Sequence, residues 1–106
     1  MTLRLEIDPR ALAEAESAAR LYEGVRPGHG NLFRREVDHV LTMVREHPGL
    51  YQQLDSECRR AFLRCFPFVV LHLANADAIQ VVAVMPTQSD PAAVEGRVGL
   101  TPGAEA

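Results

Sequence analysis

The chain has 106 residues, of which 47% are hydrophobic and 24% charged, a composition typical of a single folded domain and not of a disordered or fibrous chain. All its basic residues are Arg, and the formal net charge of -3 disfavours general binding to nucleic-acid phosphates. No apolar run reaches the roughly 18 residues that a membrane helix needs, and the amino-terminal residues lack the apolar core of a secretion signal. We therefore expect one cytoplasmic domain over residues 1–95, with no membrane partner, followed by a flexible C-terminal tail over residues 96–106.

The first half of the chain predicts a strand followed by two helices. Apolar and charged residues alternate over residues 3–7, which is typical of a half-buried strand. Asp8 and Pro9 then supply a helix cap and a residue favoured in the first helical turn. Small apolar residues recur at helical spacing over residues 9–23, and a stronger apolar stripe covers residues 33–46.

The second half predicts three strands. Apolar and β-branched residues form runs over residues 59–64, 66–73 and 78–84, and Asn, Ala and Asp at 75–77 suit a hairpin connection between the last two runs. Pro67 cannot donate a hydrogen bond to a neighbouring strand, so it separates the first run from the second. A short helix is also expected over residues 92–95.

This order predicts an α+β fold with the arrangement β-α-α-β-β-β, in which a helical hairpin packs on one face of a small, mostly antiparallel sheet. The residues expected to form its core are apolar and follow the helical or strand periodicity. They are Phe33, Val37, Val40, Leu41, Val69, Leu71, Val82 and Val84.

The candidate binding residues are the three arginines Arg59, Arg60 and Arg64, which lie in the first of the three strands predicted for the second half of the chain. Alternation along that strand would put Arg60, Phe62 and Arg64 on one face. Two interpretations have equal weight: the arginines are solvated and paired with acids, or they bind an anionic group of a partner.

Other candidates for chemistry are weaker. Cys58, Cys65 and His72 are spaced at intervals of seven residues, which places successive members on opposite faces of a strand, so no metal site is predicted. Both cysteines are expected to be thiols, and His72 is expected to be a core or edge residue. The glycines of Gly28-x-Gly30 indicate a turn before a helix, not a phosphate site, and no cofactor is expected.

The order and spacing of short motifs along the chain resemble those of the ParE/RelE superfamily of bacterial toxins, specifically its ParE-like plasmid-stabilisation branch. The resemblance extends from about residue 3 to residue 91. The motifs that carry it are Tyr22-Glu23, Arg26-Pro27-Gly28-x-Gly30, Phe33, Glu46-x-Pro48, Arg59-Arg60-x-x-x-Arg64-x-Phe66-Pro67-Phe68, Ala83-Val84 and Asp90-Pro91.

The resemblance implies the toxin of a type II toxin-antitoxin module, which a cognate antitoxin neutralises. ParE-like members block replication by binding DNA gyrase, whereas RelE-like members cut mRNA in the ribosome with a cluster of Lys and Arg and, commonly, a late Tyr. Because this chain has no Lys and no Tyr after Tyr51, gyrase binding ranks above mRNA cleavage. On this view Arg59, Arg60 and Arg64 bind the target, no residue is catalytic, and the toxin alone does not bind nucleic acid sequence-specifically.

Two alternatives stay open. The first is a RelE-like, ribosome-dependent mRNA endonuclease. The second is an inactive homologue that still binds its antitoxin, because residues 85–89 lack the cations that relatives tend to carry before the Asp-Pro pair.

Overall fold

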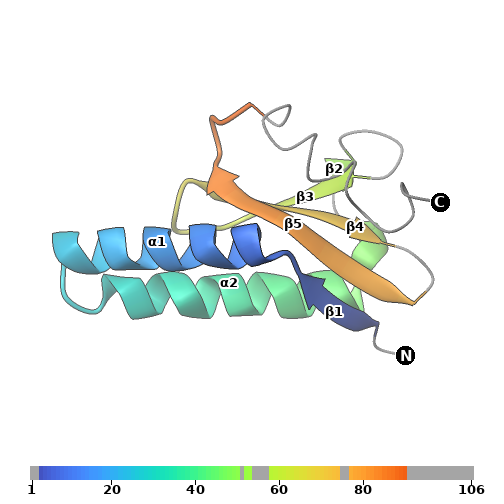
Figure 1. The fold of residues 1–106 in the computed structure, drawn as a ribbon, viewed down its shortest axis with the longest axis horizontal. Coiled ribbons are helices and arrows are strands. Elements are labelled where there is room, and N and C mark those ends of the chain that lie inside the picture. The colour runs from blue at the N-terminus through green and yellow to red at the C-terminus, as the bar shows by residue number, and fades with distance from the viewer. Residues whose placement is uncertain (1–2, 51, 54–57, 75–76, 91–106) are drawn as a thin grey trace.

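The structure is a computed structural model that describes residues 3–50, 52–53, 58–74 and 77–90. Two helices lie side by side against one face of a sheet (Figure 1), which confirms the predicted α+β fold and its helical hairpin. The elements in chain order are β1 (Arg4–Ile7), α1 (Pro9–Val25), α2 (His29–Glu46), the 3-10 helix η1 (Pro48–Leu50), β2 (Gln52–Gln53), β3 (Cys58–Phe62), β4 (Phe68–Ala74) and β5 (Ala78–Pro86).

Asp8 and Pro9 start helix α1 in the way that the sequence predicts. The Asp8 carboxylate accepts the backbone N–H of Arg10 at 2.8 Å, and Pro9 occupies the first helical turn, where its missing N–H leaves no helical hydrogen bond unmade. The same carboxylate also forms an ion pair with the Arg10 guanidinium at 2.9 Å. The helix therefore begins directly after β1.

The turn between the helices depends on two glycines and one carboxylate. Gly28 has a φ of 91°, a conformation that residues with a side chain rarely adopt. The Glu23 carboxylate accepts the backbone N–H groups of Gly28 and Gly30, each at 3.0 Å, and these two bonds lower the pKa of Glu23. A Cβ atom at Gly30 would lie 2.7 Å from the carbonyl oxygen of Ala19, so the helices approach too closely there for any larger residue.

The sheet has the strand order β1-β5-β4-β3-β2. Strand β1 pairs with β5 in parallel, and the other three pairings are antiparallel. Strand β1 can pair in parallel with β5 because the two helices carry the chain back across the sheet before the antiparallel strands begin. Strand β2, which is only two residues long, was not predicted.

A bulge in β5 alters which residues face the helices. Leu71 pairs with Ala83 and His72 with Val81, so Val82 has no partner in the β4 ladder. Val82 and Ala83 consequently both face away from the helices, and Val84 returns to the helix side. The Glu14 carboxylate of α1 accepts the backbone N–H of Val84 at 3.0 Å, which joins the helix to the strand just after the bulge.

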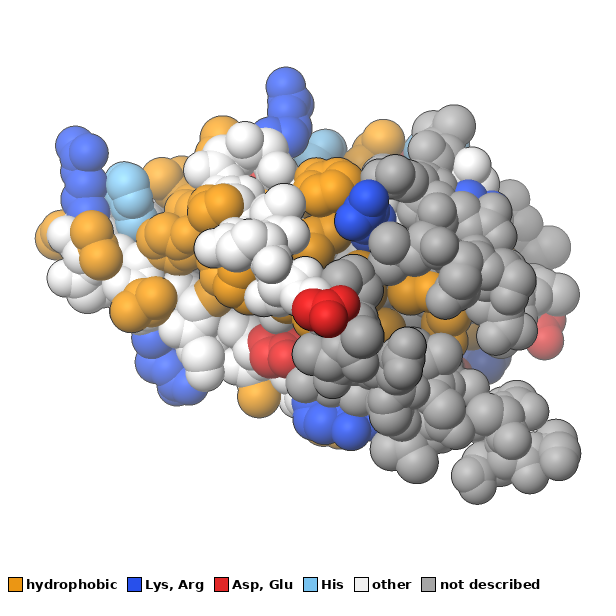
Figure 2. Space-filling view, turned by 90° about the horizontal axis from the view of Figure 1, so that it is seen from above, with side chains coloured by type: hydrophobic (Ala, Val, Ile, Leu, Met, Phe, Trp, Pro, Cys, Tyr) orange, Lys and Arg blue, Asp and Glu red, His pale blue; other side chains and the backbone are white. Residues whose placement is uncertain are grey.

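The apolar residues form two clusters, one on each face of the sheet. All eight predicted core residues are buried, but Val69, Leu71 and Val82 face away from the helices. The alternation of β4 places Val70, not its neighbours, against the helices. We call the side opposite the helices the second face. Figure 2, which views the molecule from above, shows hydrophobic side chains in several separate places on the described surface.

An aromatic cluster joins the helices to the sheet. Tyr22 of α1 and Phe33 of α2 pack against Phe66 and Phe68, which precede and follow Pro67 in the chain. The ring centroids of the contacting pairs lie 4.6 to 6.0 Å apart. These distances are typical of stabilising aromatic pairs. The cluster fixes the turn between β3 and β4 over the end of the helical hairpin.

Some predictions concern residues outside the described ranges. The expected helix over residues 92–95, the tail from residue 96 onwards and most of the expected hairpin connection at 75–77 belong to this group. Neither described helix combines the length and the apolar character that crossing a membrane requires.

Candidate functional site

Arg59 lies on the helix side of the sheet. Its strand neighbour Ala61 belongs to the helix-side core, and alternation gives Arg59 the same direction. It is half-buried and pairs across the sheet with His72, which is fully buried. Arg59 is therefore part of the packed structure on this side, and a substitution there disturbs more than an exposed surface.

Arg60 and Phe62 lie on the second face, as the alternation of the strand predicts. The guanidinium carbon of Arg60 lies 5.3 Å from the centroid of the Phe62 ring, a cation–π contact. Phe62 is 45% exposed, which is unusual for an aromatic side chain of its size. Together they present a cation and an apolar ring beside the second-face cluster of Val69 and Leu71.

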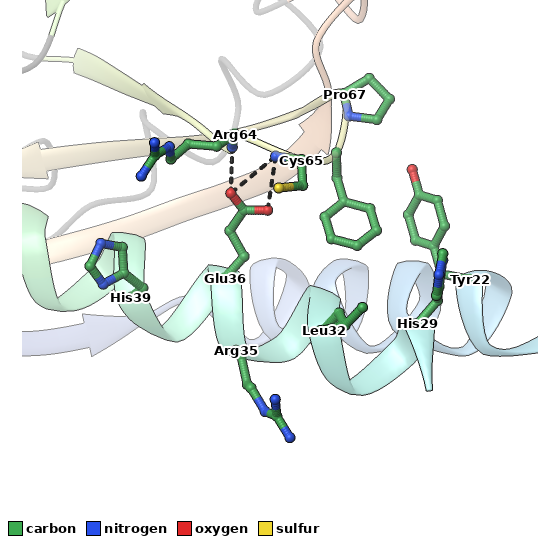
Figure 3. A pocket seen from close by; sticks show the side chains of 10 residues that line it. Tyr22, His29, Leu32, Arg35, Glu36, His39, Arg64, Cys65 and Pro67 are labelled. Carbon is green, nitrogen blue, oxygen red and sulfur yellow. Dashed lines mark hydrogen bonds between the residues drawn. The ribbon is translucent and has the colours of Figure 1, made fainter. Parts of the chain in front are cut away.

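Arg64 does not join them, because β3 ends at Phe62. The backbone N–H of Leu63 donates a hydrogen bond to the carbonyl of Phe68 at 2.9 Å. The backbone N–H groups of Arg64 and Cys65 donate to the Glu36 carboxylate of α2. The predicted grouping of Arg60, Phe62 and Arg64 on one face is therefore wrong for Arg64. Its side chain instead lies over α2 (Figure 3).

The loop after β3 and the outer side of α2 enclose a pocket of about 680 Å³. Figure 3 shows the Glu36 carboxylate pointing up to the loop, with His39 and Arg64 at one end of the pocket and Tyr22 and His29 at the other. The remaining lining residues are Leu32, Arg35, Cys65, Phe66 and Pro67.

A separate groove of about 700 Å³ runs along the outer side of α1, where it meets the end of β5. The helix contributes small residues to the groove, among them Ala13, Ser17 and Ala18, while Leu21 is 66% exposed beside them. The strand end supplies Val84, Met85 and Pro86. A surface of this composition offers apolar contacts with little steric obstruction.

The three arginines thus point in three directions, and this limits what they can do together. Arg59 faces the helices, Arg60 faces the opposite side, and Arg64 borders the α2 pocket. Stabilising the charge that develops on a phosphate during cleavage requires several cations that converge on one point. Contacts with a large partner surface do not require such convergence.

The other sequence candidates are also separated. Cys58 is buried on the second face, His72 is buried between Arg59 and Val81 of the neighbouring strands, and Cys65 is exposed in the loop. Both cysteines are thiols, as predicted, although Cys65 is not a core residue. The pKa of His72 is lowered to about 4, chiefly by burial and also by the nearby charge of Arg59, while a backbone hydrogen bond with Val70 opposes the shift.

Sequence reasoning missed the α2 pocket altogether. The charged residues on the exposed side of α2 form a pattern that is typical of a solvated helix face. Glu36 meets the loop across a separation of 28 residues, and no spacing in the sequence signals that contact. The exposed Leu32 in the middle of this charged side was the one available sign.

Several solved structures resemble this chain, and two of these likenesses identify its fold. One is to a chain of the chromosomal ParDE TA system from P. aeruginosa, with a TM-score of 0.70 and 13% identity, covering 80% of this chain and 96% of that chain. The other is to an arginine double mutant of E. coli toxin RelE in the free state, with a TM-score of 0.69 and 17% identity, covering 94% of this chain and 99% of that chain. No family model and no curated protein matches the sequence. The chain therefore has the ParE/RelE fold, which confirms the resemblance at the level of the fold.

Proposed function

We propose that the chain is the toxin of a type II toxin-antitoxin module, that it acts by binding a protein target, and that a cognate antitoxin neutralises it. The observation that carries this proposal is the likeness of fold, which extends over 94% of the chain and 99% of a RelE structure. DNA gyrase is the target that the sequence resemblance implies.

The arrangement of the arginines favours binding over RNA cleavage. Arg59, Arg60 and Arg64 diverge, and Tyr22 is packed in the aromatic cluster, so neither converging cations nor a positioned proton donor is provided by these residues. Arg60 beside the exposed Phe62 suits a protein surface instead, because Arg and aromatic side chains contribute strongly to protein interfaces.

We propose the groove along α1 as the binding site for the antitoxin. Ala13, Ser17 and Ala18 leave room for a partner helix to approach, and exposed Leu21 supplies apolar area that a partner can bury. We expect a tight complex that also contacts the arginines and survives moderate salt, since burial of apolar surface does not depend on unscreened charge.

Ribosome-dependent mRNA cleavage is the second candidate function. It is supported by the likeness to RelE, whose TM-score of 0.69 is almost the same as the 0.70 for the ParDE structure. The overall fold therefore does not favour one mechanism over the other, and only a measurement on cells can separate them.

The test is induced expression in bacteria, with and without the neighbouring reading frame. We expect growth arrest, and we expect the neighbouring gene product to relieve it. In the arrested cells mRNA should be intact, and DNA should carry breaks that are trapped in complexes with gyrase. Cleaved mRNA without DNA breaks would replace the first mechanism by the second. Absence of arrest, with a stable complex between the two proteins, would identify an inactive homologue, and absence of both would refute the proposal.

A further inference from the structure

The pocket between α2 and the loop after β3 has an apolar centre. Leu32, which is 47% exposed, lies in the middle of the pocket, and Phe66 and Pro67 line it from the loop. A large apolar side chain placed there would remove these groups from water, which stabilises a complex by about 25 cal/mol per Å² of apolar surface buried.

The ends of the pocket are basic. His39 and Arg64 lie at one end and His29 at the other (Figure 3). Among the described residues that line the pocket, Glu36 is the one acid, and its carboxylate is already occupied by the backbone N–H groups of Arg64 and Cys65. In a chain whose formal net charge is -3, the lining of this pocket therefore carries more basic than acidic side chains.

We infer that this pocket binds an acidic protein segment that inserts one large apolar side chain between its basic ends. The apolar centre and the basic ends complement those two features of the segment, and charge complementarity of this kind sets specificity and association rate. The inference rests on the pocket alone and does not depend on the proposed toxin activity.

A nucleic acid fits the pocket less well. Affinity for nucleic acid comes mainly from phosphate neutralisation, which the overall negative charge of the chain opposes. The aromatic rings that could stack on a base are engaged with each other, since Tyr22 and Phe66 form an edge-on pair with centroids 4.6 Å apart. Leu32 and Pro67, which line the same pocket, offer a base no stacking surface.

The pocket contains its own reporter of occupancy. The Cys65 thiol is exposed and lines the pocket, whereas the Cys58 side chain is buried. Alkylation of the native protein should therefore modify Cys65 first, because a buried thiol is poorly accessible to the reagent. A segment seated in the pocket should slow that reaction.

The experiment uses the full chain and a fluorescent synthetic peptide in which one Leu is flanked by Glu residues. Fluorescence anisotropy measures binding, and the rate of iodoacetamide modification at Cys65 reports where the peptide lies. We expect saturating peptide to slow Cys65 modification about fivefold or more, and the same peptide with Lys in place of Glu, or with Ser in place of Leu, to bind at least about tenfold more weakly.

Charge-reversal variants test the basic end directly. Arg64→Glu and His39→Glu should each weaken binding of the acidic peptide about tenfold, since Arg64→Glu replaces an attraction by a repulsion and His39→Glu adds a repulsion. Both side chains are exposed, and Arg64 bonds Glu36 through its backbone, so the fold should be retained in both variants. Arg20→Glu on the exposed side of α1, outside the pocket lining, is the matched control and should change affinity less than about twofold.

Three results would overturn the inference. They are no binding of the acidic peptide, binding that leaves the Cys65 rate unchanged, and equal weakening by Arg20→Glu and Arg64→Glu. A short single-stranded RNA that bound more tightly than the peptide and protected Cys65 would assign the pocket to nucleic acid instead.

Discussion

His72 shows how one buried side chain can make the stability of this fold depend on pH. It is fully buried between Arg59 and Val81, and its pKa in the folded protein is about 4, while the ordinary value in an unfolded chain is about 6.5. Between these two values the unfolded chain binds a proton that the folded protein does not. The free energy of unfolding therefore falls as the pH falls from 6.5 to 4.

We expect this residue to contribute a loss of roughly 3 kcal/mol over that interval, which follows from 1.36 kcal/mol per pKa unit. Urea unfolding at several pH values measures it. In His72→Leu, which keeps an apolar side chain of similar size, the loss over the same interval should shrink by that amount. The exposed His39→Gln serves as the control, and an unchanged pH dependence in His72→Leu would contradict the account.

At the scale of the elements, the close approach of α1 and α2 depends on Gly30. A Cβ at this position would meet the Ala19 carbonyl oxygen at 2.7 Å, and a backbone atom cannot move aside as a flexible side chain can. Gly30→Ala should therefore destabilise the fold by about 1 to 3 kcal/mol, although Ala is the better helix former.

Gly24→Ala is the matched comparison for this prediction. Gly24 also lies in a helix, but a Cβ there meets nothing within 4 Å. Its replacement should raise stability by about 0.5 to 1 kcal/mol, through helix propensity alone. Thermal unfolding of the two variants should thus give shifts of opposite sign, and a stabilised Gly30→Ala would show that the helices are not packed as closely as described.

The elements themselves could largely be predicted from the sequence, because their periodicity is local. Strand β1, the Asp8-Pro9 start of α1 and the break at Pro67 all appear in the structure, although Ile7 at the end of β1 is exposed. The parallel pairing of β1 with β5 and the bulge at Val82 arise from contacts between distant segments, and no local pattern encodes them. That is why residues on β4 and β5 were expected in a single core.

The candidate site was harder to predict than the fold. Many residues of the motifs that carry the resemblance are structural: Tyr22, Phe33, Phe66 and Phe68 form the aromatic cluster, and Glu23 accepts hydrogen bonds in the turn between the helices. Such residues determine the architecture and are silent about the target. Arg64 was misplaced because the end of β3 is set by the bonds of its loop to Glu36, which come from another element.

At the scale of the whole molecule, we propose three surfaces for binding partners. The groove along α1 is proposed for the antitoxin, which also contacts the arginines; Arg60 and Arg64 are proposed for the target; and the α2 pocket, which Arg64 borders, is proposed for an acidic segment. The helical hairpin covers one face of the sheet (Figure 1), and the Arg60 and Phe62 pair lies on the opposite face.

The central claim is that the arginines act by binding a protein target. Arg59 is half-buried against the helix side, so its replacement would mix a loss of stability with a loss of binding. The sharper variants change Arg60 and Arg64 together, first to Ala and then to Lys. Arg forms paired hydrogen bonds with a carboxylate that Lys cannot reproduce, so binding to a protein acid should suffer in both variants, whereas general attraction to phosphate should survive in the Lys variant.

The most direct measurement is growth arrest by these variants at matched expression, with the melting temperature of each purified protein as the check on folding. Arg64 is exposed, and substitutions at exposed positions usually change stability by less than about 0.5 kcal/mol. Arg60 is half-buried and packs on the Phe62 ring, so growth arrest is compared only between variants that keep the melting temperature of the wild type. We predict that the Ala variant loses growth arrest and that the Lys variant is clearly weaker than the wild type. Full arrest by a folded Ala variant would contradict the claim and would move the target-binding surface away from these arginines.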